Sequence, residues 1–483
     1  MSLTHGPTKM LLRIRWLLLL ALTGCMVNPA TGRRGISLVG EGREIEMGRE
    51  ADGQVTAQMG LVGDAELQQY VSTLGLQLAS ASERPELPWS FKVVDDPTVN
   101  AFALPGGFIY VTRGILANFE SEAELAGVLG HEIGHVTARH SVSQITRQQI
   151  QAGALGVGMI LSERVRSAGG ILNGLGQVWN LSYSRSHETE ADELGLRYLS
   201  RTAYDTEALV GVFQMLAAVS GSGDGRVPEW QLTHPYPENR EANIRGLLDA
   251  SGASGGRVAR DEYLEQLNGL VYGTNPRDGL FLETRFVHPD MAFDLTFPAG
   301  WTVVNQRTVV AAISPEEDAI VMLQLAEGDD PRSSLQTFLT QDGVTGANRR
   351  TDDSGEILRQ RANFELTTDE GAMRGEVAFV KLGSQLYQVL GYAASAGWGQ
   401  RSAAAGRTIS SLRPLTDADL LAVQPQRLEI VTIREATSLR ALNERSGSPI
   451  PAEELARVNR VTPDQMLAAG ARIKLVRGAV PGR

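Results

Sequence analysis

Cysteine is almost missing from this chain of 483 residues, which contains a single one, Cys25. A single cysteine excludes an internal disulfide and a metal site built from several thiolates. Any metal must therefore be held by nitrogen and oxygen ligands, and stability must come from burial. The apolar content of 42% and the length predict two or three domains with ordinary cores.

Positive charge is also scarce. The chain has 45 Lys and Arg residues against 56 Asp and Glu residues, which gives a formal net charge of −11. No basic cluster offsets this balance, so we expect no nucleic-acid partner. The apolar run near the N-terminus, WLLLLAL at 16–22, is too short for a stable membrane span.

Residues 1–24 have the features of a lipoprotein signal peptide. Three basic residues precede the apolar run: Lys9, Arg13 and Arg15. The run ends in LTGC, which resembles the bacterial lipobox and implies cleavage before Cys25 and its lipidation. Met26, where an Asp would resemble an inner-membrane retention signal, favours the outer membrane, to which several acyl chains anchor a protein stably. The alternative is an ordinary signal peptide that leaves a free thiol.

The remaining sequence predicts a multidomain protein. Residues 25–270 have mostly helical composition with a small β-sheet, and 280–412 read as a small α+β domain of unknown role. Strand-like runs in this second part lie at 291–304, 319–325, 376–382 and 385–394, with a helix at 331–340. Residues 427–478 predict a third domain with the order strand, helix, helix, strand.

The third domain resembles the LysM peptidoglycan-binding module. Its length, Leu439, Leu455, Asn459 and the stretch LAAGARIKLV agree with that module. The module begins with Gly-Asp-Thr-Leu, whereas EATSL stands here at 435–439. A glycan binder and a LysM-like fold used only for packing therefore both stay open, and peptidoglycan is one expected partner.

The stretch HEIGH contains the pattern H-E-x-x-H, with His131, Glu132 and His135. Residues four apart lie on one face of a helix, so both imidazoles can bind one metal ion. The glutamate then lies close to a metal-bound water, where it can act as general base. Ser121 and Glu124 form a capping box, and the pattern predicts a largely buried helix from there to about His140. We therefore predict one Zn²⁺ per chain.

The third metal ligand must come from elsewhere. The metzincin pattern needs Gly at 138 and His at 141, where this chain has Ala138 and Ser141. On a continuous helix, His140 points about 140° away from His135. We therefore interpret His140 as a residue that supports a ligand or caps the helix.

The stretch SRSHETEAD at 184–192 offers the missing ligand. Glu188 is the candidate ligand, and Asp192, one turn later, would hold the free N–H of a histidine ligand. His187 is the rival ligand, and Glu190 is expected to face elsewhere.

These stretches together resemble the zinc metallopeptidase family that includes HtpX and the CAAX prenyl proteases. They look most like its periplasmic branch, typified by the beta-barrel assembly-enhancing protease. The resemblance covers about residues 28–250 and extends to NPATGRR, NAFALPGGFIYVTRGIL, ADELGLRYL and LTHPYPENR. It implies a zincin-type fold in which His131, His135 and Glu188 bind zinc, Glu132 is the base and Asp192 lies behind the ligands.

His234 has three readings: a donor to the oxyanion, a fourth zinc ligand that holds the enzyme off, or a structural loop residue. Tyr183 and Tyr236 are alternative oxyanion donors, and Arg240 either positions substrate or makes an ion pair. The expected function is a periplasmic zinc endopeptidase, anchored to the outer membrane, that binds misfolded or stalled envelope proteins as an extended strand along 100–112. A non-proteolytic chaperone or scaffold with an occluded site, and a peptidoglycan-binding lipoprotein, are the alternatives.

Overall fold

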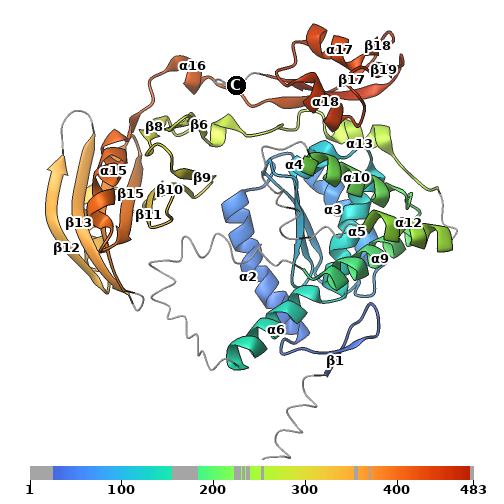
Figure 1. Cartoon of the computed structure of the whole chain (residues 1–483), viewed down its shortest axis with the longest axis horizontal. Helices are drawn as coiled ribbons and strands as arrows, with labels where there is room; N and C mark the ends of the chain where they lie inside the picture. Colours follow the sequence, from blue (N-terminus) through green and yellow to red (C-terminus); the bar gives the residue numbers. More distant parts are fainter. Residues whose placement is uncertain are drawn as a thin grey trace, which may run out of the picture. The chain divides into compact units, whose positions relative to one another are not determined.

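The computed structural model describes residues 25–154, 183–221, 230, 234, 240–251, 255–352, 357–368 and 371–478. The signal peptide expected at 1–24 and Tyr236 lie outside the described residues. The chain forms two compact units (Figure 1). The first comprises the described residues up to Thr56, Leu61–Leu270 and Leu428–Leu475, and the second comprises Ala57–Gly60, Val271–Arg427 and the residues from Val476 onward.

The first unit is mostly helical, as predicted. Its helices are α2 (Glu41–Met59, whose end belongs to the second unit), α3 (Ala65–Ser80), α4 (Arg113–Asn118), α5 (Glu122–Thr137), α6 (His140–Ala154), α9 (Arg185–Arg201), α10 (Ala208–Gly221), α12 (Arg240–Ser251) and α13 (Arg260–Gln266). Its strands before residue 270 are β1 (Cys25–Val27), β2 (Arg34–Ile36), β3 (Ser90–Val94), β4 (Ala101–Leu104) and β5 (Phe108–Thr112). Strands β1 and β2 pair antiparallel as a short hairpin.

A three-stranded sheet with the order β3-β5-β4 lies beside helices α3 and α5. Strand β5 pairs parallel to β3 and antiparallel to β4. Gly106 and Gly107 form the turn between β4 and β5, with φ of 81° and 102°, a conformation that favours glycine. The PGG turn predicted from the sequence is confirmed, and it leaves β4 at the edge of this sheet.

Helix α5 begins where the sequence predicts. Ser121 is its N-cap, and the side-chain oxygen accepts a hydrogen bond from the Glu124 backbone N–H at 3.3 Å. The Glu124 carboxylate turns back to the Glu120 backbone N–H at 2.7 Å. Every residue of α5 is buried, as the sequence pattern predicted.

The predicted end of this helix is wrong. Helix α5 ends at Thr137, and Arg139 has a left-handed backbone with φ of 56°. The Arg139 guanidinium donates to the Glu44 carboxylate at 2.8 Å and to the Val39 carbonyl at 2.9 Å. Because these contacts hold the chain in a turn, His140 starts a new helix and is not in phase with His135.

The second unit is an α+β fold, as predicted. Its larger sheet has the order β12-β13-β14-β15-β11-β10-β9, and its smaller sheet has the order β16-β8-β7-β6. The strands are β6 (Leu280–Leu282), β7 (Arg285–His288), β8 (Phe293–Thr296), β9 (Thr302–Gln306), β10 (Val309–Ile313), β11 (Ala319–Leu325), β12 (Val344–Asp352), β13 (Leu358–Thr368), β14 (Gly371–Leu382), β15 (Gln385–Ala394) and β16 (Arg413–Pro414). The helices are η1 (Pro276–Asp278), α14 (Pro331–Leu339), α15 (Trp398–Ser411) and α16 (Ala418–Leu421).

The C-terminal segment has the predicted order strand, helix, helix, strand, with one additional pair of short strands. Its elements are β17 (Arg427–Thr432), β18 (Thr437–Ser438), α17 (Leu439–Ser446), α18 (Ala452–Val458), β19 (Met466–Leu467) and β20 (Arg472–Arg477). Residues 428–475 belong to the same compact unit as helices α3 to α13. Lys474 is fully buried there, and its Nζ donates to the carbonyls of Ala117 and Phe119 at 3.1 and 2.9 Å. It also pairs with the Glu120 carboxylate at 2.8 Å, so this segment packs on the residues just before α5.

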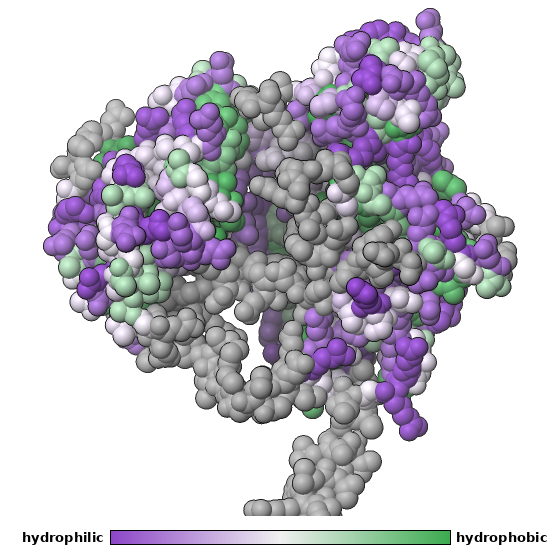
Figure 2. All heavy atoms as spheres, viewed as in Figure 1, coloured by the Kyte–Doolittle hydropathy of each residue, from purple (hydrophilic) through white to green (hydrophobic). Residues whose placement is uncertain are grey.

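Hydrophilic residues cover most of the described surface in the view of Figure 2. Within the described ranges, no helix has both the length and the apolar character needed to cross a membrane.

Candidate metal centre

The centre is built where α5 and α9 pack closely. Glycines at the contact allow the two backbones to approach: a side chain at Gly195 would meet the His131 backbone nitrogen at 3.0 Å, and one at Gly134 would meet the Ala191 carbonyl at 3.0 Å. Such a distance leaves almost no room for a Cβ atom, so only glycine fits without a shift. The close packing brings Glu188 of α9 next to His131 and His135 of α5.

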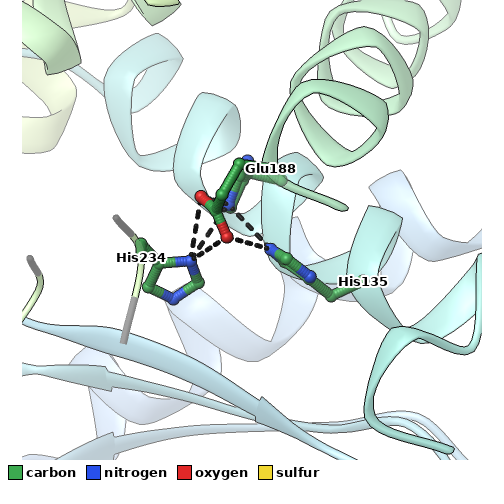
Figure 3. Close-up of side chains that lie close together, drawn as sticks. His135, Glu188 and His234 are labelled. Atoms are coloured by element: carbon green, nitrogen blue, oxygen red, sulfur yellow. Dashed lines mark hydrogen bonds and ion pairs between the residues drawn. The ribbon is translucent and has the colours of Figure 1, made fainter. Parts of the chain in front are cut away.

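Four buried side chains each bring one possible ligand atom to the same place, with these atoms within 4.8 Å of one another: His131, His135, Glu188 and His234. Figure 3 shows three of them, with the Glu188 carboxylate between the rings of His135 and His234. The Nε2 atoms of His131 and His135 lie 3.0 Å apart, and the Glu188 oxygens lie 3.6 and 3.4 Å from them.

The fourth side chain closes the group. The His234 Nδ1 lies 3.1 Å from Glu188 Oε1 and 3.4 Å from His131 Nε2. In a tetrahedron with metal–ligand bonds of 2.0–2.1 Å, neighbouring ligands are about 3.3 Å apart. The printed distances of 3.0 to 3.6 Å are close to this value, so the cluster could hold a tetrahedral ion such as Zn²⁺.

Glu132 gives an independent sign of a missing group. Its side chain is 0% exposed, and neither carboxylate oxygen has a hydrogen-bond partner among the described residues. Burial raises the pKa of Glu132, and the nearby His234 and His131 only partly oppose this effect. A buried carboxylate is normally hydrogen-bonded, so this one is placed for a group that the described residues do not supply.

His131 is supported from inside the fold. Its Nδ1 lies 2.9 Å from the Asp192 carboxylate, which in turn accepts two hydrogen bonds from Arg240, at 2.8 and 2.6 Å. Arg240 also contacts Glu188 at 2.9 Å. Burial alone would raise the pKa of Asp192, but Arg240 and His131 outweigh it and lower the pKa. Asp192 therefore stays charged and can hold the N–H of the ring, and Arg240 makes the ion pair that was one of its two readings.

His135 is supported from the other side. Its Nδ1 lies 2.9 Å from Nδ1 of His140, and Tyr183 stacks on its ring at 3.9 Å between centroids. Burial lowers the pKa of His135 well below its ordinary value, which keeps the ring neutral. His140 is thus beside the predicted ligand because the chain turns at Arg139, and it is not one of the four converging side chains.

The other residues named from the sequence each have their own contacts. His187 stacks on His140 at 4.3 Å and points no atom at the centre. The Tyr183 hydroxyl is engaged with Ser141 Oγ at 2.8 Å. His234 stacks on the buried Trp230, with ring centroids 4.2 Å apart. Cys25 opens strand β1 and is not one of the four converging side chains.

Glu190 was expected to face elsewhere than the metal, and it is not one of the four converging side chains. Its carboxylate lies 2.9 Å from Nε2 of His140. No spacing rule gave this contact, because it depends on the turn at Arg139. The stacking partner Trp230 was also missed, and the sequence contains no pattern that links it to His234.

A metal-binding cluster of histidines and a glutamate with a second, unpaired glutamate beside it is the arrangement of a metal-dependent hydrolase. Residues 65–248 match the model of Peptidase family M48, so this part of the chain is similar to the peptidases of that family.

The chain is also similar to proteins that are named as proteases. The beta-barrel assembly-enhancing protease of Escherichia coli (strain K12) is 31% identical over 262 residues, which cover 52% of this chain and 53% of that protein. The mitochondrial metalloendopeptidase OMA1 of Schizosaccharomyces pombe is 31% identical over 230 residues, covering 46% of this chain and 65% of that protein. OMA1 of Arabidopsis thaliana is 35% identical over 194 residues, covering 38% of each chain. The chain spans about half the length of the first of these curated relatives.

Proposed function

We propose that the chain is a zinc-dependent endopeptidase of the bacterial cell envelope. The observation that carries the proposal is Glu132, a fully buried carboxylate without a hydrogen-bond partner from the described residues, beside four converging ligand atoms. A bound zinc ion would lower the pKa of a water molecule and polarise a peptide carbonyl. His131, His135 and Glu188 would hold it.

Glu132 is the proposed general base. Burial raises its pKa, and a carboxylate with a raised pKa is a better proton acceptor at neutral pH. It would take a proton from the attacking water and pass it to the leaving amine. His234 Nε2 lies 3.6 Å from a Glu132 oxygen, so His234 is also within reach of the reacting groups.

His234 supports a second reading of the site. In the conformation described, its Nδ1 completes a four-atom ligand set, whereas a catalytic zinc site keeps one position open. We propose that His234 binds the metal in a resting state and that it must leave before a substrate enters. The non-proteolytic scaffold with an occluded site is the alternative in which His234 never leaves.

The proposed location is the periplasm, with a lipid on Cys25 that anchors the chain to the outer membrane. The proposed substrates are misfolded or stalled envelope proteins. A relative named beta-barrel assembly-enhancing protease supports an envelope role. Strand β4 is an edge strand in the same unit as the centre and offers backbone groups for an extended substrate. Peptidoglycan is a further proposed partner of the LysM-like segment 427–478.

The test compares wild type, Glu132→Gln and the control Glu193→Gln for cleavage of an unfolded protein such as casein, with zinc content measured for each. Glu193 is an exposed carboxylate on helix α9. We expect stoichiometric zinc in all three proteins and a loss of at least about 100-fold in cleavage only in Glu132→Gln. Stoichiometric zinc in wild type without Glu132-dependent cleavage would contradict the protease and favour the scaffold.

A further inference from the structure

A chain of contacts leads from His135 out to the N-terminal hairpin. His135 Nδ1 lies 2.9 Å from His140 Nδ1, and His140 Nε2 lies 2.9 Å from Glu190 Oε2. Both histidines are buried, whereas the Glu190 side chain is 11% exposed. The contacts therefore cross from the metal centre to the edge of the unit.

The hydrogen positions in this chain follow from elementary chemistry. If the Nε2 of His135 binds a metal, its proton sits on Nδ1 and needs an acceptor. His140 Nδ1 can accept only if the proton of that neutral ring is on Nε2. The Glu190 carboxylate is an acceptor at Nε2 and selects this tautomer. Glu190 thus fixes the orientation of the His135 ring through His140, which lies between them.

The outer end of the chain is held by the loop between β1 and β2. The Asn28 side-chain amide donates to Glu190 Oε1 at 3.3 Å. The Asn28 Oδ1 accepts from the backbone N–H groups of Ala30 and Thr31 at 2.9 and 3.2 Å, which turns the amide nitrogen toward Glu190. Asn28 is buried, and its backbone N–H donates to the Arg33 carbonyl at 2.7 Å. These backbone contacts give the loop a defined shape, in which the Asn28 amide faces Glu190.

Two neighbouring groups complete the surroundings of the chain. The His187 ring stacks on His140, with planes 12° apart, and restricts its rotation. Arg33 lies 4.0 Å from Glu190, but its side chain is 77% exposed, so its ion pair is weak. Asn28 and the Thr31 side chain of the same loop are therefore the contacts that tie Glu190 to the hairpin.

We propose that His140, Glu190 and Asn28 form a positioning device through which the N-terminal hairpin sets the orientation of His135 and thereby the zinc affinity. The proposal deepens the proposed function and rests on it, because it concerns the same metal centre. The segment next to the proposed lipid anchor becomes a part of the active site without touching the metal or the substrate.

The experiment measures the zinc dissociation constant of the full chain by competition with a coloured chelator. The variants are His140→Phe, His140→Asn, Glu190→Gln and Asn28→Ala, with Glu193→Gln as control. We expect His140→Phe to weaken zinc binding about 10- to 100-fold, because partners behind metal ligands typically have effects of this size. His140→Asn keeps an acceptor near Nδ1 and should restore part of the affinity. Glu190→Gln and Asn28→Ala should weaken binding by decreasing amounts, down to a few-fold.

A second readout is the visible spectrum of the protein loaded with Co²⁺, which reports the ligand field and needs no cleavage. A purely structural role would leave this spectrum unchanged, whereas an altered His135 shifts it. Glu190 is 11% exposed and Asn28 belongs to a short loop, so Glu190→Gln and Asn28→Ala test the idea even if His140→Phe does not fold. Wild-type zinc affinity and an unchanged Co²⁺ spectrum in both would overturn it, while a wild-type chain that binds no zinc would overturn the proposed function itself.

Discussion

His131 and His135 lie one turn apart on the same helix, but their outer nitrogens meet different surroundings. His131 faces Asp192 and Arg240, which are both buried and belong to helices α9 and α12. His135 faces His140, behind which Glu190 and the hairpin loop lie at the edge of the unit. One side of the centre is thus held by buried side chains of two helices, and the other side depends on the short loop between β1 and β2. We therefore expect the side around His131 to tolerate substitutions less well than the side around His135.

The largest effect should come from the residue that both sides share. Glu188→Ala removes the carboxylate that lies within 3.6 Å of both histidine nitrogens, so zinc binding should weaken by more than about 100-fold and cleavage should be lost. His187→Ala is the matched control on the same helix and should keep its zinc. Metal analysis after gel filtration measures both. If His187→Ala loses the metal and Glu188→Ala keeps it, the ligand assignment is reversed.

The next largest effect concerns the stability of the side of the centre around His131, called the inner side below. Arg240→Ala leaves Asp192 and Glu188 buried without their cation, so we expect the free energy of unfolding to fall by about 3–5 kcal/mol. Arg245→Ala removes an exposed arginine from the same helix, whose pair with Glu241 lies at the surface, and should cost at most about 1 kcal/mol. Denaturant unfolding of the metal-free proteins measures the difference. Equal losses would mean that the inner side is no more rigid than the surface.

A third test compares the two supporting carboxylates directly. Asp192→Asn should weaken zinc binding about 10- to 100-fold, because the amide supports the ligand N–H less well and removes one of the two carboxylates that Arg240 contacts. Glu190→Gln should weaken zinc binding by about 10-fold or less, since His140 lies between Glu190 and the ligand His135. Chelator competition at constant pH gives both values. A stronger effect of Glu190→Gln would place the main support on the outer side.

The smallest effect is a pH dependence. Burial lowers the pKa of His187 from 6.5 to about 4, so between these values the unfolded chain binds a proton that the folded chain does not. The folded state therefore loses stability as the pH falls from about 6.5 to 4, and has no such loss above 6.5. His187→Gln should show a shallower loss than wild type between pH 7 and pH 5. Parallel curves for the two proteins would show that His187 titrates normally.

Much of the centre could be predicted from the sequence because it follows from local rules. The i, i+4 spacing places His131 and His135 on one face, the capping box starts the helix at Ser121, and Glu188 is a carboxylate at the start of a second helix. The metal cluster of the structure contains all three of these predicted ligand positions.

The parts that could not be predicted depend on distant partners. The helix end at Thr137 results from the contact of Arg139 with Glu44, 95 residues away, and the role of Glu190 results from Asn28, 162 residues away. In the second unit, the runs at 319–325 and 385–394 were found because they are apolar and match β11 and β15. Strand β12 was not found, since its sequence VTGANRRTD lacks an apolar alternation and becomes a strand by pairing with β13.

The buried Lys474 has a consequence for how this protein is made. It satisfies carbonyls at the end of α4, just before the helix that carries His131, yet 355 residues separate it from Phe119. During synthesis, the metal-binding helix therefore emerges long before the strand that completes its surroundings. The proposed protease would thus stay incomplete while most of its own nascent chain is still unfolded and open to cleavage.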